Sequence, residues 1–196
     1  MEFQNLVMKR RMVRNFANKP VSLDAIKRIL DLAQHTPSAG FTQGQSIIVV
    51  TDPTHRKAIA ATCEEDEYIA SGFDPFISKA PVLLIPCTSE AAYHRRYQEA
   101  DKLESDGSEI FWPIPYWFMD IGCTVMIILL AVVNEGLVAG FVGSKDLDQL
   151  RKLLNIPGEI TPVGVIAIGH RAPDVPSPSL KRGRKRVAEV VHYERW

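Results

Sequence analysis

The sequence predicts a single domain that mixes α-helices with short, buried β-strands, and three observations support this prediction. Its 196 residues are enough to enclose one substantial hydrophobic core. Hydrophobic residues make up 46% and charged residues 23%, as in an ordinary globular protein. Amphipathic helical segments alternate along the chain with apolar, β-branched runs. That alternation indicates strands covered by helices.

Two helices are predicted at the start of the chain. Phe3, Leu6 and Val7 form a first apolar stripe at helical spacing. A second stripe repeats over 23–33. Ser22 precedes it, and a serine in that position accepts a hydrogen bond from the first turn. We therefore expect the second helix to begin directly after Ser22.

A loop, a strand and a third helix follow. Residues 36–45 are mostly small or polar, which predicts a loop. Residues 46–51 form a continuous β-branched run, which favours a strand buried on both faces. Asp52 and Pro53 then supply an N-cap and a proline suited to the first helical position. This pair predicts a helix that continues to Ala61.

The centre of the chain contains a second buried strand and the longest helix. The strand covers 81–87. Residues 88–115 are charged and irregular, so we expect a variable excursion over the surface of the single domain 1–196. A helix is predicted for 116–135. Its apolar stretch, 121–133, is too short to span a bilayer and favours a core helix.

The last third should add one helix and two strands. A glycine-rich connection over 136–143 leads to a helix at 146–154, and 161–169 forms a third apolar strand. Three prolines between 171 and 179 predict an extended tail. The apolar run 187–191 predicts a closing strand at an edge of the sheet.

The cysteines and the N-terminus indicate the cellular compartment. The three cysteines are odd in number and far apart, and none belongs to a C-x-x-C pair. This favours a reducing cytosol and argues against structural zinc. The N-terminus has no long apolar core, so no secretory signal is expected. We expect a cytoplasmic protein with neither a metal site nor a membrane partner.

The neutral net charge hides two concentrated basic clusters. They hold nine of the 23 Lys and Arg residues and leave 14 against 23 acidic residues elsewhere. Their members are Lys9, Arg10, Arg11 and Arg14, then Lys181, Arg182, Arg184, Lys185 and Arg186. The planar guanidinium fork pairs bidentately with phosphate or carboxylate, so the clusters predict a phosphate-binding pair. The alternative is two solvated charge runs, one of them a loose tail.

No familiar catalytic motif accompanies these clusters. The sequence lacks G-x-G-x-x-G after a strand, G-x-x-x-x-G-K-[ST], H-E-x-x-H and G-x-S-x-G. Its five histidines are scattered. An enzyme without an evident nucleophile, base or metal usually takes its chemistry from a cofactor. A phosphorylated organic cofactor would also neutralise the arginines.

Five segments, in order and near the expected spacing, resemble the nitroreductase-like family of FMN-dependent oxidoreductases. They are 10–16 (RRMVRNF), 36–43 (TPSAGFTQ), 136–143 (GLVAGFVG), 162–169 (PVGVIAIG) and 181–196. The resemblance implies an α+β fold with a central mixed sheet flanked by helices. It also implies an obligate homodimer with a C-terminal extension. Both subunits would line each of two interfacial FMN sites.

The resemblance further implies which residues hold the flavin. Arg10 would contact the FMN phosphate, Arg11 the phosphate or ribityl chain, and Arg14 the pyrimidine edge. A fixed cation there stabilises the negative charge that reduced FMN carries near N1 and O2. The implied set is Arg10, Arg11, Met12, Arg14, Pro37, Ser38, Ala39, Gln43, Phe141, Val142, Gly143, Ser144, Arg182 and Arg184. Pro37, Ser38, Ala39 and Gln43 would come from the partner subunit.

Three positions depart from the family pattern. Met12 stands where serine is usual, Phe41 replaces a common asparagine, and Gly44-Gln45 replaces a common Pro-Trp pair. The loss of the serine removes one hydroxyl that could bond the phosphate or ribityl chain. The charges that would bind phosphate are unaffected.

The implied activity is a ping-pong reduction with NADPH or NADH as reductant and a nitroaromatic, quinone or similar small molecule as oxidant. No acidic or basic side chain is required for hydride transfer at flavin N5. Arg14 and Gly143 are the candidates for shaping that chemistry, and glycine permits a close backbone approach. Tyr93, His94 and Tyr116 are candidate proton donors.

Two other functions remain open from the sequence. One is a non-catalytic flavin-binding or sensing protein. The other is a nucleic-acid binder that uses both basic clusters. The acidic remainder of the chain would repel a phosphate backbone at long range, so no nucleic-acid partner is expected.

Overall fold

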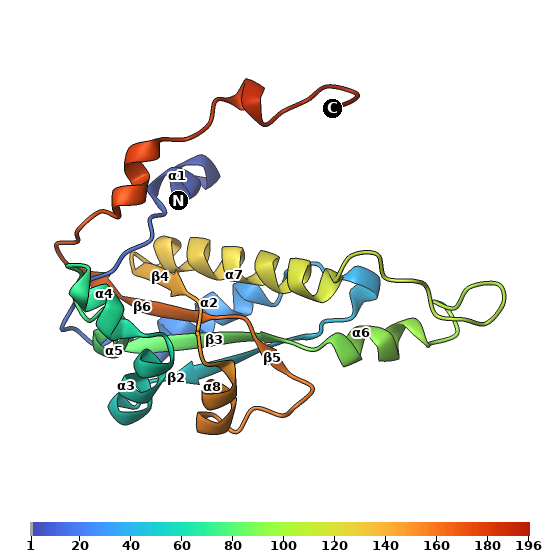
Figure 1. Ribbon diagram of the computed structural model, residues 1–196, viewed down its shortest axis with the longest axis horizontal. Helices are drawn as coiled ribbons and strands as arrows, with labels where there is room; N and C mark the ends of the chain where they lie inside the picture. Colours follow the sequence, from blue (N-terminus) through green and yellow to red (C-terminus); the bar gives the residue numbers. More distant parts are fainter. Residues whose placement is uncertain (1) are drawn as a thin grey trace.

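A computed structural model describes residues 2–196 and contains a six-stranded sheet with helices on both faces (Figure 1). The strands pair in the order β1-β6-β3-β2, while β4 pairs with β6 and β5 pairs with β3. Their bounds are β1 Phe16–Ala17, β2 Gln45–Val50, β3 Val82–Thr88, β4 Val138–Val142, β5 Thr161–Pro162 and β6 Val165–Arg171. These pairs are antiparallel, and a parallel bridge between Met12 and Ala139 lies outside the named strands. The predicted α+β fold is confirmed.

Eight α-helices surround the sheet. Their bounds are α1 Phe3–Lys9, α2 Leu23–Ala33, α3 Pro53–Thr62, α4 Glu65–Ala70, α5 Phe76–Lys79, α6 Glu90–Tyr97, α7 Tyr116–Asn134 and α8 Leu147–Leu153. Ser22, Asp52 and Asp146 each accept a hydrogen bond from a backbone N–H of the first turn that follows. These caps confirm the predicted starts of α2, α3 and α8, because each satisfies an amide that the helix leaves unpaired.

Strands β3 and β6, at the centre of the sheet, separate the hydrophobic core into two layers, one on each face. On β3, Leu83, Ile85 and Cys87 face one layer with α3, α5 and α8, whereas Val82 and Leu84 face the other with α2 and α7. This division follows the two-residue period of a strand. All seven residues of β3 are buried, which confirms the buried strand predicted at 81–87.

The prediction that 46–51 is a strand buried on both faces is wrong about its burial. β2 is an edge strand that pairs with β3, and Val50 is its one buried residue. A β-branched run indicates a strand, but it does not determine whether that strand occupies the centre or the edge of a sheet.

Three predictions near the C-terminus also need correction. Strand β4 occupies most of the expected connection 136–143. The expected strand 161–169 is divided into β5 and β6, with Gly164 between them at a φ of 153°. The expected closing strand 187–191 instead begins with a 3-10 turn, Val187–Glu189, and residues 178–196 are all exposed. The tail therefore finds no sheet edge within its own chain (Figure 1).

The segment 88–115 is less irregular than its composition predicts. It begins with helix α6, which Ser89 caps through a hydrogen bond from Ala92 N–H. The loop that follows folds back onto this helix. Glu109 Oε1 lies 2.6 Å from His94 Nδ1 and accepts a hydrogen bond from Trp112 Nε1 at 2.6 Å.

Helix α7 is long and apolar enough to cross a membrane by length and composition, a test that core helices also pass. It packs on the sheet through Ile128, Leu129 and Val132. Only 44% of its most apolar stretch is buried. Phe118, Met119 and Met126 remain exposed on it.

Replacing Gly140 with alanine should destabilise the fold. A Cβ at this position would lie 2.5 Å from the carbonyl oxygen of Val13, so the N-terminal segment would have to move. We expect a loss of about 1–3 kcal/mol, as for other overpacked core sites, measured by denaturant unfolding. The control is Gly158→Ala, whose Cβ would meet open space and which should stay within about 0.5 kcal/mol. A Gly140→Ala protein as stable as the parent would contradict this account.

The contact between His94 and Glu109 should make the excursion sensitive to pH. The hydrogen bond to Glu109 raises the pKa of His94 above its usual 6.5. Because the folded-state pKa is raised, the stabilising contribution is complete below pH 6.5 and is lost as pH rises through the folded pKa. An NMR titration of the ring should show a raised midpoint that falls in Glu109→Gln. Glu104→Gln, on the same loop, should leave the midpoint unchanged.

Candidate functional site

The first basic cluster lies against strand β4. Val13 N–H donates a 3.0 Å hydrogen bond to the carbonyl oxygen of Ala139, and its side chain is buried. Gly140 permits this approach, as the predicted clash of an added Cβ shows. The segment 10–14 is therefore fixed next to the strand that contains Phe141 and Val142.

The three arginines of this segment have different surroundings. Arg10 Nη1 is buried and has no hydrogen-bond partner among residues 2–196. The guanidinium of Arg14 stacks over Phe73, 5.1 Å from the ring centroid. Arg11 Nη1 instead donates to the carbonyl oxygens of Met8 and Arg10 at 2.6 and 2.8 Å. Arg11 thus caps the end of α1.

An anion fits Arg10 and Arg14 better than solvent alone does. A buried N–H without a partner loses about 1–3 kcal/mol of hydration. Neither arginine has an ion-pair partner within the described part of the chain. A phosphate or other anionic group next to Arg10 would satisfy the unpaired N–H and neutralise its charge.

The turn after β4 is held on both sides and is open at its centre. Phe141 packs its ring against Gly164, where an added Cβ would lie 2.6 Å from the ring. Ser144 Oγ donates to the carbonyl oxygen of Thr62 at 3.1 Å. Between them, Gly143 is exposed, and a Cβ there would meet nothing within 4 Å. A flat ligand could therefore approach the backbone of Gly143 closely.

The loop 37–43 is anchored at the opposite end of α7. Ala39 N–H donates to Asp120 Oδ2 at 2.8 Å, and Arg96 Nε donates to the carbonyl oxygen of Gly40 at 2.9 Å. Ser38 Oγ accepts a 2.9 Å hydrogen bond from Gln43 N–H within the loop. The loop is therefore held by the start of α7 and by α6.

One chain assembles only part of the expected site. The structure places 10–14 against β4, which leads into the turn 143–144, but the loop 37–43 lies beyond the length of α7 (Figure 1). The 19 residues of this helix span about 28 Å. Asp120 is near its start, and β4 follows its end.

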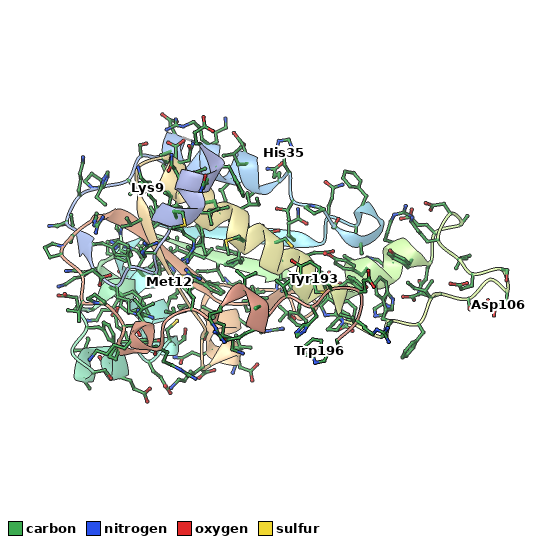
Figure 2. The ribbon with its side chains drawn as sticks, turned by 90° about the horizontal axis from the view of Figure 1, so that it is seen from above. Lys9, Met12, His35, Asp106, Tyr193 and Trp196 are labelled. Atoms are coloured by element: carbon green, nitrogen blue, oxygen red, sulfur yellow. The ribbon has the colours of Figure 1, made fainter. Side chains whose placement is uncertain are left out.

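The second basic cluster stays apart from the first in this chain. Arg182 and Arg184 are exposed in a tail that runs clear of the body (Figure 1). Figure 2 marks the far part of this tail by Tyr193 and Trp196, and Trp196 is fully exposed. The predicted pairing of the two clusters is not formed within a single chain.

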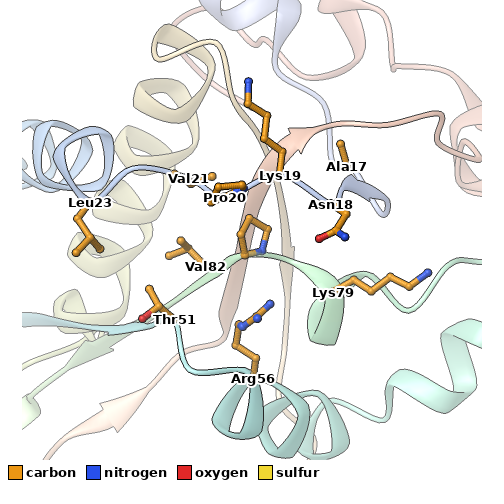
Figure 3. Close-up of a pocket in the computed structure, with 11 residues that line it drawn as sticks. Ala17, Asn18, Lys19, Pro20, Val21, Leu23, Thr51, Arg56, Lys79 and Val82 are labelled. Atoms are coloured by element: carbon orange, nitrogen blue, oxygen red, sulfur yellow. The ribbon is translucent and has the colours of Figure 1, made fainter.

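Two pockets of the structure lie elsewhere. They have volumes of about 440 and 340 Å³, and both are lined in part by Lys19, Pro20 and Val21. Neither includes a residue of the expected flavin site. Figure 3 shows the ends of Lys19 and Lys79 directed away from the larger pocket, so these two side chains do not direct their charges into it. No group of side chains suited to a metal ion occurs in residues 2–196.

The expectation that Tyr93 donates a proton is not supported by its environment. Tyr93 is 1% exposed, and its hydroxyl donates to Asp120 Oδ2 at 2.7 Å. Burial, followed by this hydrogen bond to a carboxylate, raises the pKa of Tyr93. His94 is engaged by Glu109, as described above. Sequence reasoning missed Asp120, although an acid at the head of a long apolar run is a signal that could have identified it.

Comparisons with known proteins agree with this arrangement. The model of the nitroreductase family matches residues 7–170. An iodotyrosine deiodinase of Nematostella vectensis is 26% identical over 97% of this chain and 74% of its own length. An NADPH-dependent oxidoreductase of Staphylococcus aureus is 26% identical over 87% of this chain and 65% of its own length. The solved structure of an iodotyrosine deiodinase bound to FMN and 3-iodo-L-tyrosine has a TM-score of 0.74 at 20% identity, covering 98% of this chain and 99% of that one.

The family match covers most of the chain. It includes the arginine segment 10–14, the strand β4 against which that segment lies, and the loop 37–43 that Asp120 holds. The fold agrees with that of the solved structure over almost its whole length. The chain therefore belongs to the nitroreductase family of FMN-dependent oxidoreductases.

Proposed function

We propose that this chain forms a cytoplasmic homodimer that binds FMN between its subunits and uses NADPH or NADH to reduce a nitroaromatic, quinone or similar small oxidant. The observation that carries the proposal is the buried, unpartnered Nη1 of Arg10, in a segment that lies against β4, the strand that leads into the open turn at Gly143. Membership of the family supplies the cofactor class. The similarity to an NADPH-dependent oxidoreductase supports reduction by NADPH, and the similarity to an iodotyrosine deiodinase leaves the oxidant open.

The residues of the first cluster suit the two ends of FMN. Arg10 would hold the phosphate, because its Nη1 is buried and has no hydrogen-bond partner in residues 2–196. Arg14 would face the pyrimidine edge of the flavin, where its positive charge favours the reduced, more negative form. Arg11 would support this pair by fixing the end of α1. Arg182 and Arg184 would add phosphate contacts once the tail is placed.

FMN, when bound, supplies the redox chemistry by accepting hydride from NAD(P)H and then reducing the oxidant in a ping-pong sequence. The protein contributes the geometry. Gly143 leaves room beside the backbone for a ring, and the Phe141 and Ser144 contacts keep this turn in place. No side chain at the turn needs to exchange a proton with the ligand. The main effect of Arg14 is therefore electrostatic.

The exposed apolar surface supports a homodimer. Phe3, Val7 and Met8 of α1 are 45–71% exposed, and several apolar residues of α7 and of the tail are exposed too. Clustered apolar exposure of this kind typically marks an interface. A second copy placed over α7 would bring its own loop 37–43 towards β4 of the first. That arrangement would complete both sites at once.

The proposed function is tested by purification, spectroscopy and turnover. The protein should be yellow, release FMN on heating, and oxidise NADPH or NADH when a quinone or nitroaromatic is present. Arg10→Ala should weaken FMN binding by about 1.5–3 kcal/mol, or roughly ten- to a hundredfold, because it removes a charge-assisted hydrogen bond. Lys9→Ala, an exposed member of the same cluster, is the matched control and should bind FMN normally.

Arg14→Ala should behave differently from Arg10→Ala. We expect a lower flavin reduction potential and slower reduction by NADPH, with a smaller loss of affinity. Equal affinity losses in both variants, with an unchanged potential, would argue against the placement of Arg14. A protein that holds FMN but never oxidises NADPH or NADH would indicate a flavin-binding or sensing role instead.

Mixed dimers test whether each site is shared. When Arg10→Ala and Gln43→Ala chains are combined, a shared site leaves one site intact and one doubly defective, because each site takes its arginine and loop from different chains. We expect about half of the wild-type FMN content, measured on affinity-purified mixed dimers. If each site lay within a single chain, the mixed dimer would instead have two weakened sites and none with wild-type affinity.

A further inference from the structure

The carboxylate of Asp120 joins three separate parts of the chain. Its Oδ2 accepts hydrogen bonds from Ala39 N–H at 2.8 Å and from the Tyr93 hydroxyl at 2.7 Å. Asp120 belongs to α7, Tyr93 to α6, and Ala39 to the loop after α2. One oxygen atom therefore connects the excursion 88–115 to the loop 37–43.

The loop that Asp120 holds has a conformation that side chains rarely adopt. Phe41 and Gln43 have φ values of 55° and 52°, in the left-handed region. Such backbone angles are unfavourable for residues other than glycine and persist only where surrounding contacts enforce them. Phe41 is nevertheless 73% exposed, so its own side chain contributes little packing in this chain. Neighbouring groups must therefore maintain the φ values of Phe41 and Gln43.

Helix α6 supplies those neighbouring groups. Tyr97 lies against Gly40 and Tyr93 lies against Gly44, since an added Cβ at either glycine would be 2.7 Å from the ring. Arg96 Nε also donates to the carbonyl oxygen of Gly40, and its Nη1 and Nη2 bind Asp101 at 2.7 and 2.8 Å. The loop therefore rests on aromatic rings and is fixed at two backbone positions.

We propose that Asp120 is a positioning residue that presets the loop 37–43 for the FMN bound by the partner subunit, with α6 as the rigid support. This inference rests on the proposed function for the flavin, but the geometry of the junction does not. The proposal gives helix α6, the first part of the excursion 88–115, a role at the FMN that is bound by the other subunit. It also explains why the Tyr93 hydroxyl is buried and hydrogen bonded rather than available to a substrate.

The test measures the loop directly in the FMN-loaded dimer. Asp120→Ala should accelerate hydrogen exchange at the amides of 39–43 by about tenfold or more, because the Ala39 N–H loses its acceptor. FMN affinity should fall by roughly tenfold. Asp120→Asn keeps an oxygen at the same place and should restore both properties to within about threefold of wild type.

Tyrosine variants provide a second arm that leaves the packing intact. Tyr93→Phe removes one hydrogen bond to Asp120 but keeps the ring against Gly44, so exchange at 39–43 should rise by an intermediate amount. Tyr68→Phe is the matched control, since it also removes one hydroxyl and keeps the ring, but on α4, at the other end of the sheet from α6 and the loop 37–43 (Figure 1). It should match wild type in exchange and in FMN affinity.

Two results would overturn the proposal. One is wild-type exchange and affinity in both Asp120→Ala and Tyr93→Phe. The other is exchange that rises evenly over the whole chain, which would mean general destabilisation. If the wild-type protein bound no FMN, the proposed function would fail and so would the role in trans. The exchange measurement would still determine whether Asp120 fixes the loop.

Discussion

The central position of β6 is the constraint on which the rest of the structure depends. This strand pairs with β3 on one side and with β1 and β4 on the other. Its residues 165–168 are completely buried between the two helical layers. Because β6 fixes β4, it also fixes the turn at Gly143 and the arginine segment that lies against Ala139. The half-site within one chain is therefore built on the most buried part of the sheet.

The other half of the site depends on a different part of the molecule. The loop 37–43 forms its hydrogen bonds to α6 and to the start of α7. A helix about 28 Å long separates the two halves, so no local rearrangement can join them. This separation gives a physical reason for the homodimer that we propose. It also accounts for the exposed apolar residues of α1 and α7, which a single chain leaves uncovered.

The two halves are held with different rigidity. The loop 37–43 is fixed by backbone hydrogen bonds and by two aromatic rings, although two of its residues have unfavourable backbone angles. The tail carries the second basic cluster and has every side chain from 178 onwards exposed. Unfavourable backbone angles that several neighbouring groups maintain suggest that the conformation of the loop is set before a ligand binds. An exposed basic segment gains its order only when it meets an anion or a second chain.

The sequence alone determined the helix starts, the buried strand β3 and the family, because caps, apolar runs and motif spacing are local properties. Ser22 and Asp52 act as caps in the positions where their residue types predict them, and α8 begins next to the predicted position 146. Only the tertiary structure showed that β2 is an edge strand, that β4 lies within the glycine-rich segment, and that 187–191 forms no strand. Those features depend on which distant partner is available for pairing. The roles of Asp120 and Tyr93 were likewise decided by contacts between three segments that are remote in sequence, and no local pattern encodes such a junction.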